Sequence, residues 1–212
     1  GRDGRSMSFS LQSAAAGISI AMGGYAYLSV ESRYLGAFLF SFGLYAVCQY
    51  QIPLFTGRIA YLGRPGGYRP GKLLLMLLYN FIGAAAVGLL FLPMSGGMDI
   101  LSVAHKKLIQ LPHESFIRGL FCGMIVFIGV DICRRYDDPL GRYLGVLLGV
   151  PAFILAGFEH CVADIFYLAA AWKHGLGFDA SQLLFLLMVI LGNSAGALIM
   201  NALVPQPTPK TT

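Results

Sequence analysis

Three ionisable side chains, Glu159, His160 and Asp164, lie within six residues of one another inside a long apolar segment. Ionisable groups are costly at membrane depth and usually mark a functional site there. A histidine can donate a hydrogen bond when neutral and a proton when charged. His160 is therefore a candidate substrate contact, and the alternative is a buried structural histidine bonded to a carbonyl group or to Glu159.

A second apolar segment, from about Leu35 to Leu62, is interrupted by Gln49, Gln51, Pro53, Thr56 and Gly57. Proline cannot donate a helical hydrogen bond and disrupts the turn before it. Backbone that leaves a helix inside a membrane is tolerated only where protein buries it or where it lines a wet cavity. We expect this break and the one near His160 to face each other across a pore. Two ordinary kinked helices are the alternative.

Composition sets the class of protein. The chain has 212 residues, of which 57% are hydrophobic and 12% are charged, whereas a soluble domain has roughly 25% charged residues. Six helices of about 20 apolar residues would use nearly all of this apolar inventory. Soluble enzymes and nucleic-acid-binding modules are thereby excluded, and the net charge of +5 fits basic loops. The four cysteines lack CxxC spacing, so we expect no metal and no cofactor.

The apolar segments predict an all-α membrane protein with six transmembrane helices. They run over about 11–30, 35–62, 72–92, 115–133, 140–172 and 180–203. The stretch from Pro93 to Glu114 is expected to be a long polar connection. We interpret residues 1–6 as an expression scar, 7–204 as one channel domain and 205–212 as a disordered tail. We expect a multi-pass protein of a prokaryotic-type inner (plasma) membrane, and the distribution of basic residues favours both termini in the cytoplasm.

The two halves of the chain resemble each other. Arg33-Tyr34-Leu35-Gly36 opens the second segment, and Arg142-Tyr143-Leu144-Gly145 opens the fifth. The third and sixth segments share a face of small residues that includes Asn80 and Asn193. Residues 11–92 and 115–203 therefore form two repeats of three spans, with the second and fifth helices broken. An odd number of crossings makes the repeats inverted, an arrangement typical of transporters. Chance similarity between apolar segments is the alternative.

Several motifs resemble the signature of the formate/nitrite transporter family. The most specific is Gly157-Phe158-Glu159-His160, followed by Cys161-Val162-Ala163-Asp164. Three others occur in the expected order: Leu54-Phe55-Thr56-Gly57, Arg118-Gly119-Leu120-Phe121-Cys122 and Leu191-Gly192-Asn193-Ser194-Ala195-Gly196. The resemblance extends over nearly the whole chain, from about Ala15 to Ala202.

This resemblance implies an aquaporin-like protomer, a homopentamer in a lipid bilayer, and a pore for small monovalent anions such as formate, nitrite or hydrosulfide. It identifies His160, Thr56 and Lys107 as pore residues. It implies an apolar constriction formed by Phe40, Leu44, Leu54, Phe55, Val126 and Phe153. Glu159, Asp164 and Asn193 are interpreted as structural polar residues, with Glu159 holding the broken helices.

Three residues depart from the family pattern. Pro53 and Asp164 stand where glutamate and asparagine are usual, and Gly123 replaces an asparagine, which we expect to widen the pore. These departures bear on the substrate more than on the fold.

The expected mechanism has three parts. Lys107 at the mouth raises the local anion concentration, the apolar rings exclude hydrated ions, and Thr56 with His160 hydrogen-bonds or protonates the substrate.

Three other functions remain open. An intramembrane enzyme would need a metal-ligand set such as HExxH, which is absent from the sequence. A structural or receptor membrane protein would not need paired broken helices. A channel for water, ammonia or urea would differ in how its flux depends on substrate charge and on pH.

Overall fold

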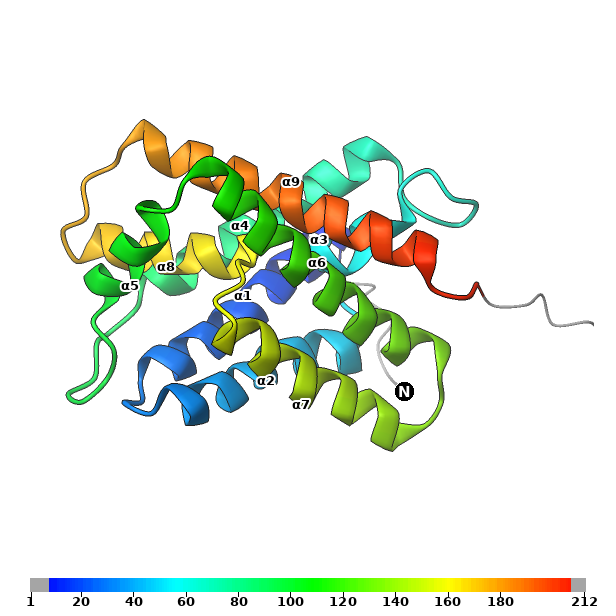
Figure 1. Ribbon diagram of the computed structural model, residues 1–212, viewed down its shortest axis with the longest axis horizontal. Coiled ribbons are helices and arrows are strands. Elements are labelled where there is room, and N and C mark those ends of the chain that lie inside the picture. Colours follow the sequence, from blue (N-terminus) through cyan, green and yellow to red (C-terminus); the bar gives the residue numbers. More distant parts are fainter. Residues whose placement is uncertain (1–7, 207–212) are drawn as a thin grey trace, which may run out of the picture.

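In the computed structural model, residues 8–206 are described, and this part of the chain is helical with no β-strand (Figure 1). Residues 1–6 and most of the predicted tail lie outside the described residues. The helices are α1 (Phe9–Leu28), α2 (Arg33–Tyr50), α3 (Phe55–Arg58), the 3₁₀ helix η1 (Ile59–Tyr61), α4 (Pro70–Leu89), α5 (Ile100–Leu108), α6 (Pro112–Arg135), α7 (Pro139–Leu155), α8 (Cys161–Lys173) and α9 (Ala180–Leu203).

Local sequence sets where these helices begin. The side chains of Ser32, Asp99 and Asp179 cap α2, α5 and α9 by accepting hydrogen bonds from backbone N–H groups in the first turn. Proline stands at the start of α4, α6 and α7, where its missing N–H group has no helical partner to lose.

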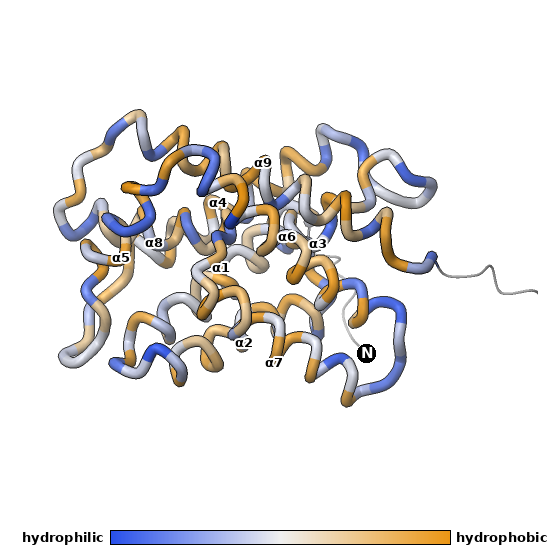
Figure 2. The backbone as a smooth tube through the Cα atoms, viewed as in Figure 1, coloured by the Kyte–Doolittle hydropathy of each residue, from blue (hydrophilic) through white to orange (hydrophobic). Residues whose placement is uncertain are grey.

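The apolar helices are long enough for a membrane. By length and composition, α4, α6 and α9 could each cross one, and α2 with α3–η1 forms a fourth candidate that bends by 52° at its break. Figure 2 shows hydrophilic segments at the two ends of the molecule, with mostly hydrophobic helices between them. By the same measure α1 and the α7–α8 pair are not candidates, so the predicted count of six spans stays a prediction.

Close helix packing depends on glycine at two related interfaces. α1 packs on α4, and α6 packs on α9. A Cβ atom on Gly17 would overlap the carbonyl oxygen of Asn80, and one on Gly123 would overlap that of Asn193. Small residues permit such close approach between helices in membranes. Gly123 therefore faces α9, and the expectation that it widens the pore is wrong.

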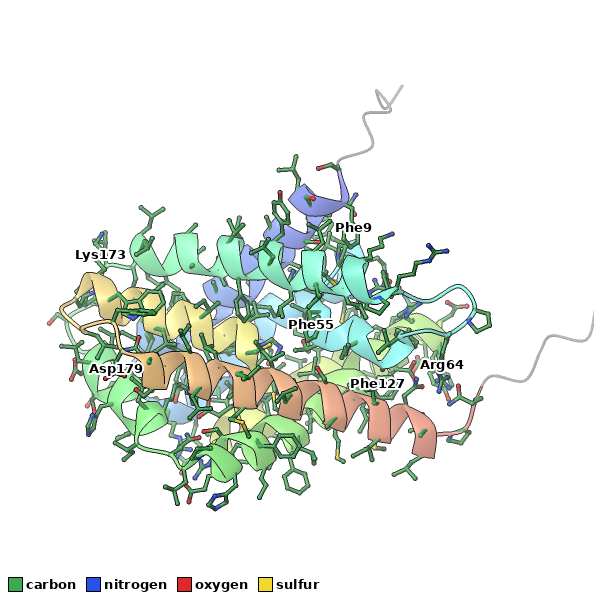
Figure 3. All side chains as sticks on the ribbon, turned by 90° about the horizontal axis from the view of Figure 1, so that it is seen from above. Phe9, Phe55, Arg64, Phe127, Lys173 and Asp179 are labelled. Atoms are coloured by element: carbon green, nitrogen blue, oxygen red, sulfur yellow. The ribbon has the colours of Figure 1, made fainter. Side chains whose placement is uncertain are left out.

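The connection before α6 contains a helix that was not expected from the sequence. Pro93 to Glu114 is not a continuous polar link, because α5 forms within it, with Ile100 and Ala104 buried. Figure 3 shows Lys173 and Asp179 at one end of the molecule and Arg64 at the other. In Figure 1, α5 lies at the same end as the loop between α8 and α9.

Candidate functional site

The two broken helices meet at their breaks. Thr56 lies in the first turn after the α2–α3 break, and His160 is the N-cap residue of α8. The Thr56 Oγ1 and His160 Nε2 atoms are 2.8 Å apart, and both side chains are buried. This contact confirms that the two breaks face each other, while a pore between them stays a prediction.

An asparagine on α9 holds the second break in place. The Asn193 side-chain oxygen accepts a hydrogen bond from the backbone N–H of Cys161 at 2.9 Å. Its Nδ2 donates to the carbonyl oxygens of Glu159 at 2.9 Å and of Gly119 at 2.8 Å. These bonds satisfy backbone groups that have no helical partner at the break.

An asparagine on α4 does the same for the first break. The Asn80 side-chain oxygen accepts from the backbone N–H of Phe55 at 2.8 Å. Its Nδ2 donates to the carbonyl oxygens of Pro53 at 3.0 Å and of Ser13 at 2.6 Å. The two braces share one pattern, which supports the inverted repeat and makes Pro53 the counterpart of Glu159. In the sequence, Asn80 stands out only as part of a small-residue face.

The hydrogen bonds of His160 define the form of its ring. Its Nδ1 atom accepts a hydrogen bond from the backbone N–H of Ala163 at 3.2 Å, so the lone pair is on Nδ1. The proton of a neutral ring is then on Nε2, which donates to Thr56 Oγ1. The Thr56 hydroxyl accepts this bond and keeps its own hydrogen for another acceptor. Protonating Nδ1 would break the helix cap.

A dry apolar constriction lies next to this pair. Its lining residues are Ile20, Phe40, Leu44, Val126, Val150, Phe153 and His160, and they leave no volume open to a water molecule. The Phe153 ring stacks against the imidazole of His160, with ring centres 6.1 Å apart. The Phe40 ring meets the Phe153 ring edge-on at 6.1 Å.

The structure brings together four of the six predicted constriction residues: Phe40, Leu44, Val126 and Phe153. Leu54 instead lines a small separate cavity of about 10 Å³, and Phe55 is buried in the apolar core. Ile20 and Val150 complete the ring and were missed, because nothing in their type or spacing separates them from other core residues.

A vestibule of about 440 Å³ leads to His160 from the α5 end. Its charged or ionisable lining residues include Arg33, Lys106, Lys107, Arg118, Glu159, His160 and Asp164. Lys107 Nζ lies 2.5 Å from Glu159 Oε2 and 3.0 Å from Asp164 Oδ1. Lys107 is thus engaged by two acids, and its expected role of raising the local anion concentration stays a prediction.

Electrostatics keep Lys107 charged. Burial acts against its charged form, but the facing acids Asp164 and Glu159 outweigh burial and raise the pKa of Lys107 above its usual range. The Lys107 ammonium also lies over the Tyr167 ring, 4.8 Å from its centre.

Glu159 joins the vestibule to the break. Its second oxygen, Oε1, accepts a hydrogen bond from Gln110 Nε2 at 2.7 Å, and its backbone N–H donates to the carbonyl oxygen of Arg118 at 3.3 Å. Arg118 Nη1 in turn donates to the carbonyl oxygen of Gly157 at 3.0 Å. These bonds fit the predicted structural role of Glu159. The role of Gln110 could not be predicted from the sequence, because it depends on how the segment between α5 and α6 places this side chain next to Glu159.

The opposite mouth differs in charge. A cavity of about 320 Å³ there is lined by Cys48, Gln49, Gln51, Cys133, Arg134 and Arg142. Its charged lining residues are arginines, whereas the vestibule combines acids with bases. The two mouths of the molecule therefore differ in charge although the repeats share a backbone plan.

Curated relatives are named for anion transport. The chain is 27% identical over 176 residues to the nitrite transporter NirC of Escherichia coli (strain K12), which covers 74% of this chain and 65% of that protein. It is 24% identical over 149 residues to the formate channel FocA of Haemophilus influenzae, covering 64% and 52% respectively. The chain thus spans about half to two thirds of the length of these relatives.

Solved structures share the fold. An FNT family ion channel superimposes with a TM-score of 0.79 at 26% identity, over 92% of this chain and 87% of that one. A pentameric formate channel with formate bound gives a TM-score of 0.75 at 21% identity, over 89% and 91%. The sequence profile described as Formate/nitrite transporter matches residues 3–206, nearly the whole chain, and the protein therefore belongs to the formate/nitrite transporter family.

Proposed function

We propose that this multi-pass membrane protein is a channel for small monovalent anions or their weak acids, of the formate, nitrite or hydrosulfide type. The observation that carries the proposal is the Thr56–His160 pair, which joins two broken helices between a wet vestibule and a dry constriction. The matched proteins are named as channels and transporters, and an enzymatic function has no support from them.

Each part of the pathway has a physical task. A bare anion pays a large desolvation cost in a dry constriction. Thr56 can donate its hydroxyl hydrogen to an entering substrate, because His160 Nε2–H already satisfies the oxygen. His160 then acts through a hydrogen bond rather than as a proton donor, since its Nδ1 is committed to the α8 cap. Phe40 and Phe153 admit only a small, largely dehydrated species.

Assembly and orientation belong to the same proposal. Outward-facing apolar side chains on α2 and α7 form a groove of about 490 Å³ that lipid or another copy would cover. A pentamer is supported by the structural neighbour named as pentameric. We place the termini in the cytoplasm, since Arg64, Arg134 and Arg142 lie at the end where α9 finishes, as the excess of basic residues in cytoplasmic loops favours.

A channel for a neutral solute is the second candidate. Two acids contact the single amine of Lys107, which disfavours a free anion next to this cluster when both acids are ionised. Urea or ammonia would not meet this repulsion. The two candidates differ in whether flux requires an ionisable substrate.

Replacing His160 tests the proposed function. We expect His160→Ala to lower formate uptake into proteoliposomes about tenfold to a hundredfold, the effect of losing a hydrogen bond that supports a charged or strongly polar partner. Tyr50→Phe, at an exposed side chain at the end of α2, is the matched control and should keep wild-type uptake. Unchanged uptake in His160→Ala would contradict the proposal.

A further inference from the structure

The vestibule holds one more acid than the nearest base can neutralise. Glu159 Oε2 lies 2.5 Å from Lys107 Nζ, and Asp164 Oδ1 lies 3.0 Å from the same nitrogen. The two carboxyl groups are therefore close neighbours. Both acids are buried, with Glu159 3% exposed and Asp164 0% exposed. Two carboxylates and one ammonium would leave a net charge of −1 in a site of low dielectric.

Asp164 also lacks hydrogen-bond partners. Neither of its carboxyl oxygens accepts a hydrogen bond from any described residue, and its contact with Lys107 has the distance of an ion pair without hydrogen-bond geometry. Asp164 lines the vestibule. By contrast, both oxygens of Glu159 are bonded, to Lys107 and Gln110. A buried carboxylate with no donor is costly, whereas a protonated carboxyl can satisfy itself by donating to a neighbour.

No other base forms an ion pair with Asp164 within the described residues. The other ionisable groups around it are His160, Cys161 and Tyr167 near it on its own segment, Cys122 and Arg118 on α6, Tyr27 on α1, Arg33 at the start of α2, and Lys106 on α5. Arg118 and Arg33 donate to the carbonyl oxygens of Gly157 and Leu155. Lys106 is exposed, and Lys107 alone lies within ion-pair distance of Asp164.

We propose that Glu159 and Asp164 share one proton, and that this proton determines whether the vestibule admits an anion. With the proton bound, the two acids and Lys107 form a neutral cluster. When the proton leaves to vestibule water, the cluster carries one negative charge directly before Thr56 and His160. The inference builds on the proposed channel function and makes Asp164 its specificity-determining residue.

Nitrate is the probe that isolates this proton, because the charge of nitrate is constant between pH 5 and 8. We expect nitrate flux through wild type in proteoliposomes to fall about tenfold as pH rises across this range, as one added charge nearby repels the anion. In Asp164→Asn, Lys107 faces only Glu159, so the cluster stays neutral and nitrate flux should not change with pH. The ratio of nitrate flux in Asp164→Asn to that in wild type should therefore rise from about one at pH 5 to about ten at pH 8.

A structural role alone gives a different result. If Asp164→Asn changed flux by one constant factor at all pH values, the inference would be overturned. Asp137→Asn makes the same substitution at a fully exposed side chain at the opposite end, and it should keep the wild-type pH profile. Lys107 holds its charge over this range, so it adds no titration of its own.

Infrared spectroscopy detects the proton without any transport. Purified wild type should show the carbonyl stretch of a protonated carboxyl group at pH 5 and lose it by pH 8, and Asp164→Asn should lack this pH-dependent band while Asp137→Asn retains it. If Asp164→Asn does not assemble, Glu159→Gln replaces it, since either change leaves one acid facing Lys107. A wild-type spectrum with every carboxyl group ionised would overturn the inference.

The two proposals can fail separately. Wild type that carries none of formate, nitrite and hydrosulfide would contradict the proposed function, and the infrared band would still decide whether the acids share a proton. Formate flux together with identical nitrate pH profiles for wild type and Asp164→Asn would contradict only the shared proton.

Discussion

Thr56 and His160 make different hydrogen bonds at the centre of the molecule. His160 Nε2–H donates to Thr56 Oγ1, and the imidazole Nδ1 is held by the first turn of α8. The threonine hydroxyl is therefore the group with a hydrogen left to offer a substrate. In the proposed function, His160 therefore positions the hydroxyl and Thr56 contacts the substrate.

Substitutions at Thr56 test this division. Thr56→Val keeps the shape of the side chain but removes the hydroxyl, and we expect it to lower formate uptake about tenfold. Thr56→Ser keeps the hydroxyl and should retain most of the uptake. Uptake is measured in proteoliposomes with equal amounts of inserted protein. Equal uptake by the valine and serine variants would contradict a hydrogen-bonding role.

The helices position this pair through two asparagine braces. Asn80 on α4 and Asn193 on α9 each bond a backbone N–H and a carbonyl group at a break, and each ties a neighbouring helix to it. Because the braced groups have no helical partner, losing a brace leaves buried backbone polar groups unsatisfied.

Removal of a brace should be costly. We expect Asn193→Ala to lower the free energy of unfolding by about 2–3 kcal/mol, seen as a lower melting temperature of purified protein in detergent. Ser194→Ala on the same helix removes only a local bond to the Ile190 carbonyl and should change stability by about 0.5 kcal/mol or less. Matching melting temperatures for the two variants would show that the brace is dispensable.

The breaks could be predicted from the sequence because proline and buried ionisable residues are rare in apolar helices, where each carries a large energetic cost. Phe40, Leu44, Val126 and Phe153 were predicted as a ring through the family resemblance. The helix α5 was not predicted, since its apolar face is short and its capping Asp99 lies in a polar stretch. The convergence of Lys107 on two acids depends on that helix and could not be read from spacing.

At the scale of the whole molecule, the two repeats have similar backbones, but the cavities at the two ends of the molecule are lined by different charged residues. The repeats share the Asn80 and Asn193 braces, yet Pro53 stands at the counterpart position of Glu159. The α5 end thus holds a Lys107–acid cluster, and the opposite end holds Arg134 and Arg142. Under the two proposals, a substrate would pass the Lys107–acid cluster at one end and Arg134 and Arg142 at the other, where Arg142 is paired with Asp137.

The most direct test of the central claim is the substrate selectivity of the wild-type protein. Initial uptake rates of formate, nitrite, hydrosulfide and urea would be measured in proteoliposomes at pH 6, with protein-free liposomes as the background. We predict uptake of at least one of the three weak-acid substrates well above background, with uptake of urea at background. Uptake of urea alone, or of none of the four, would contradict this prediction.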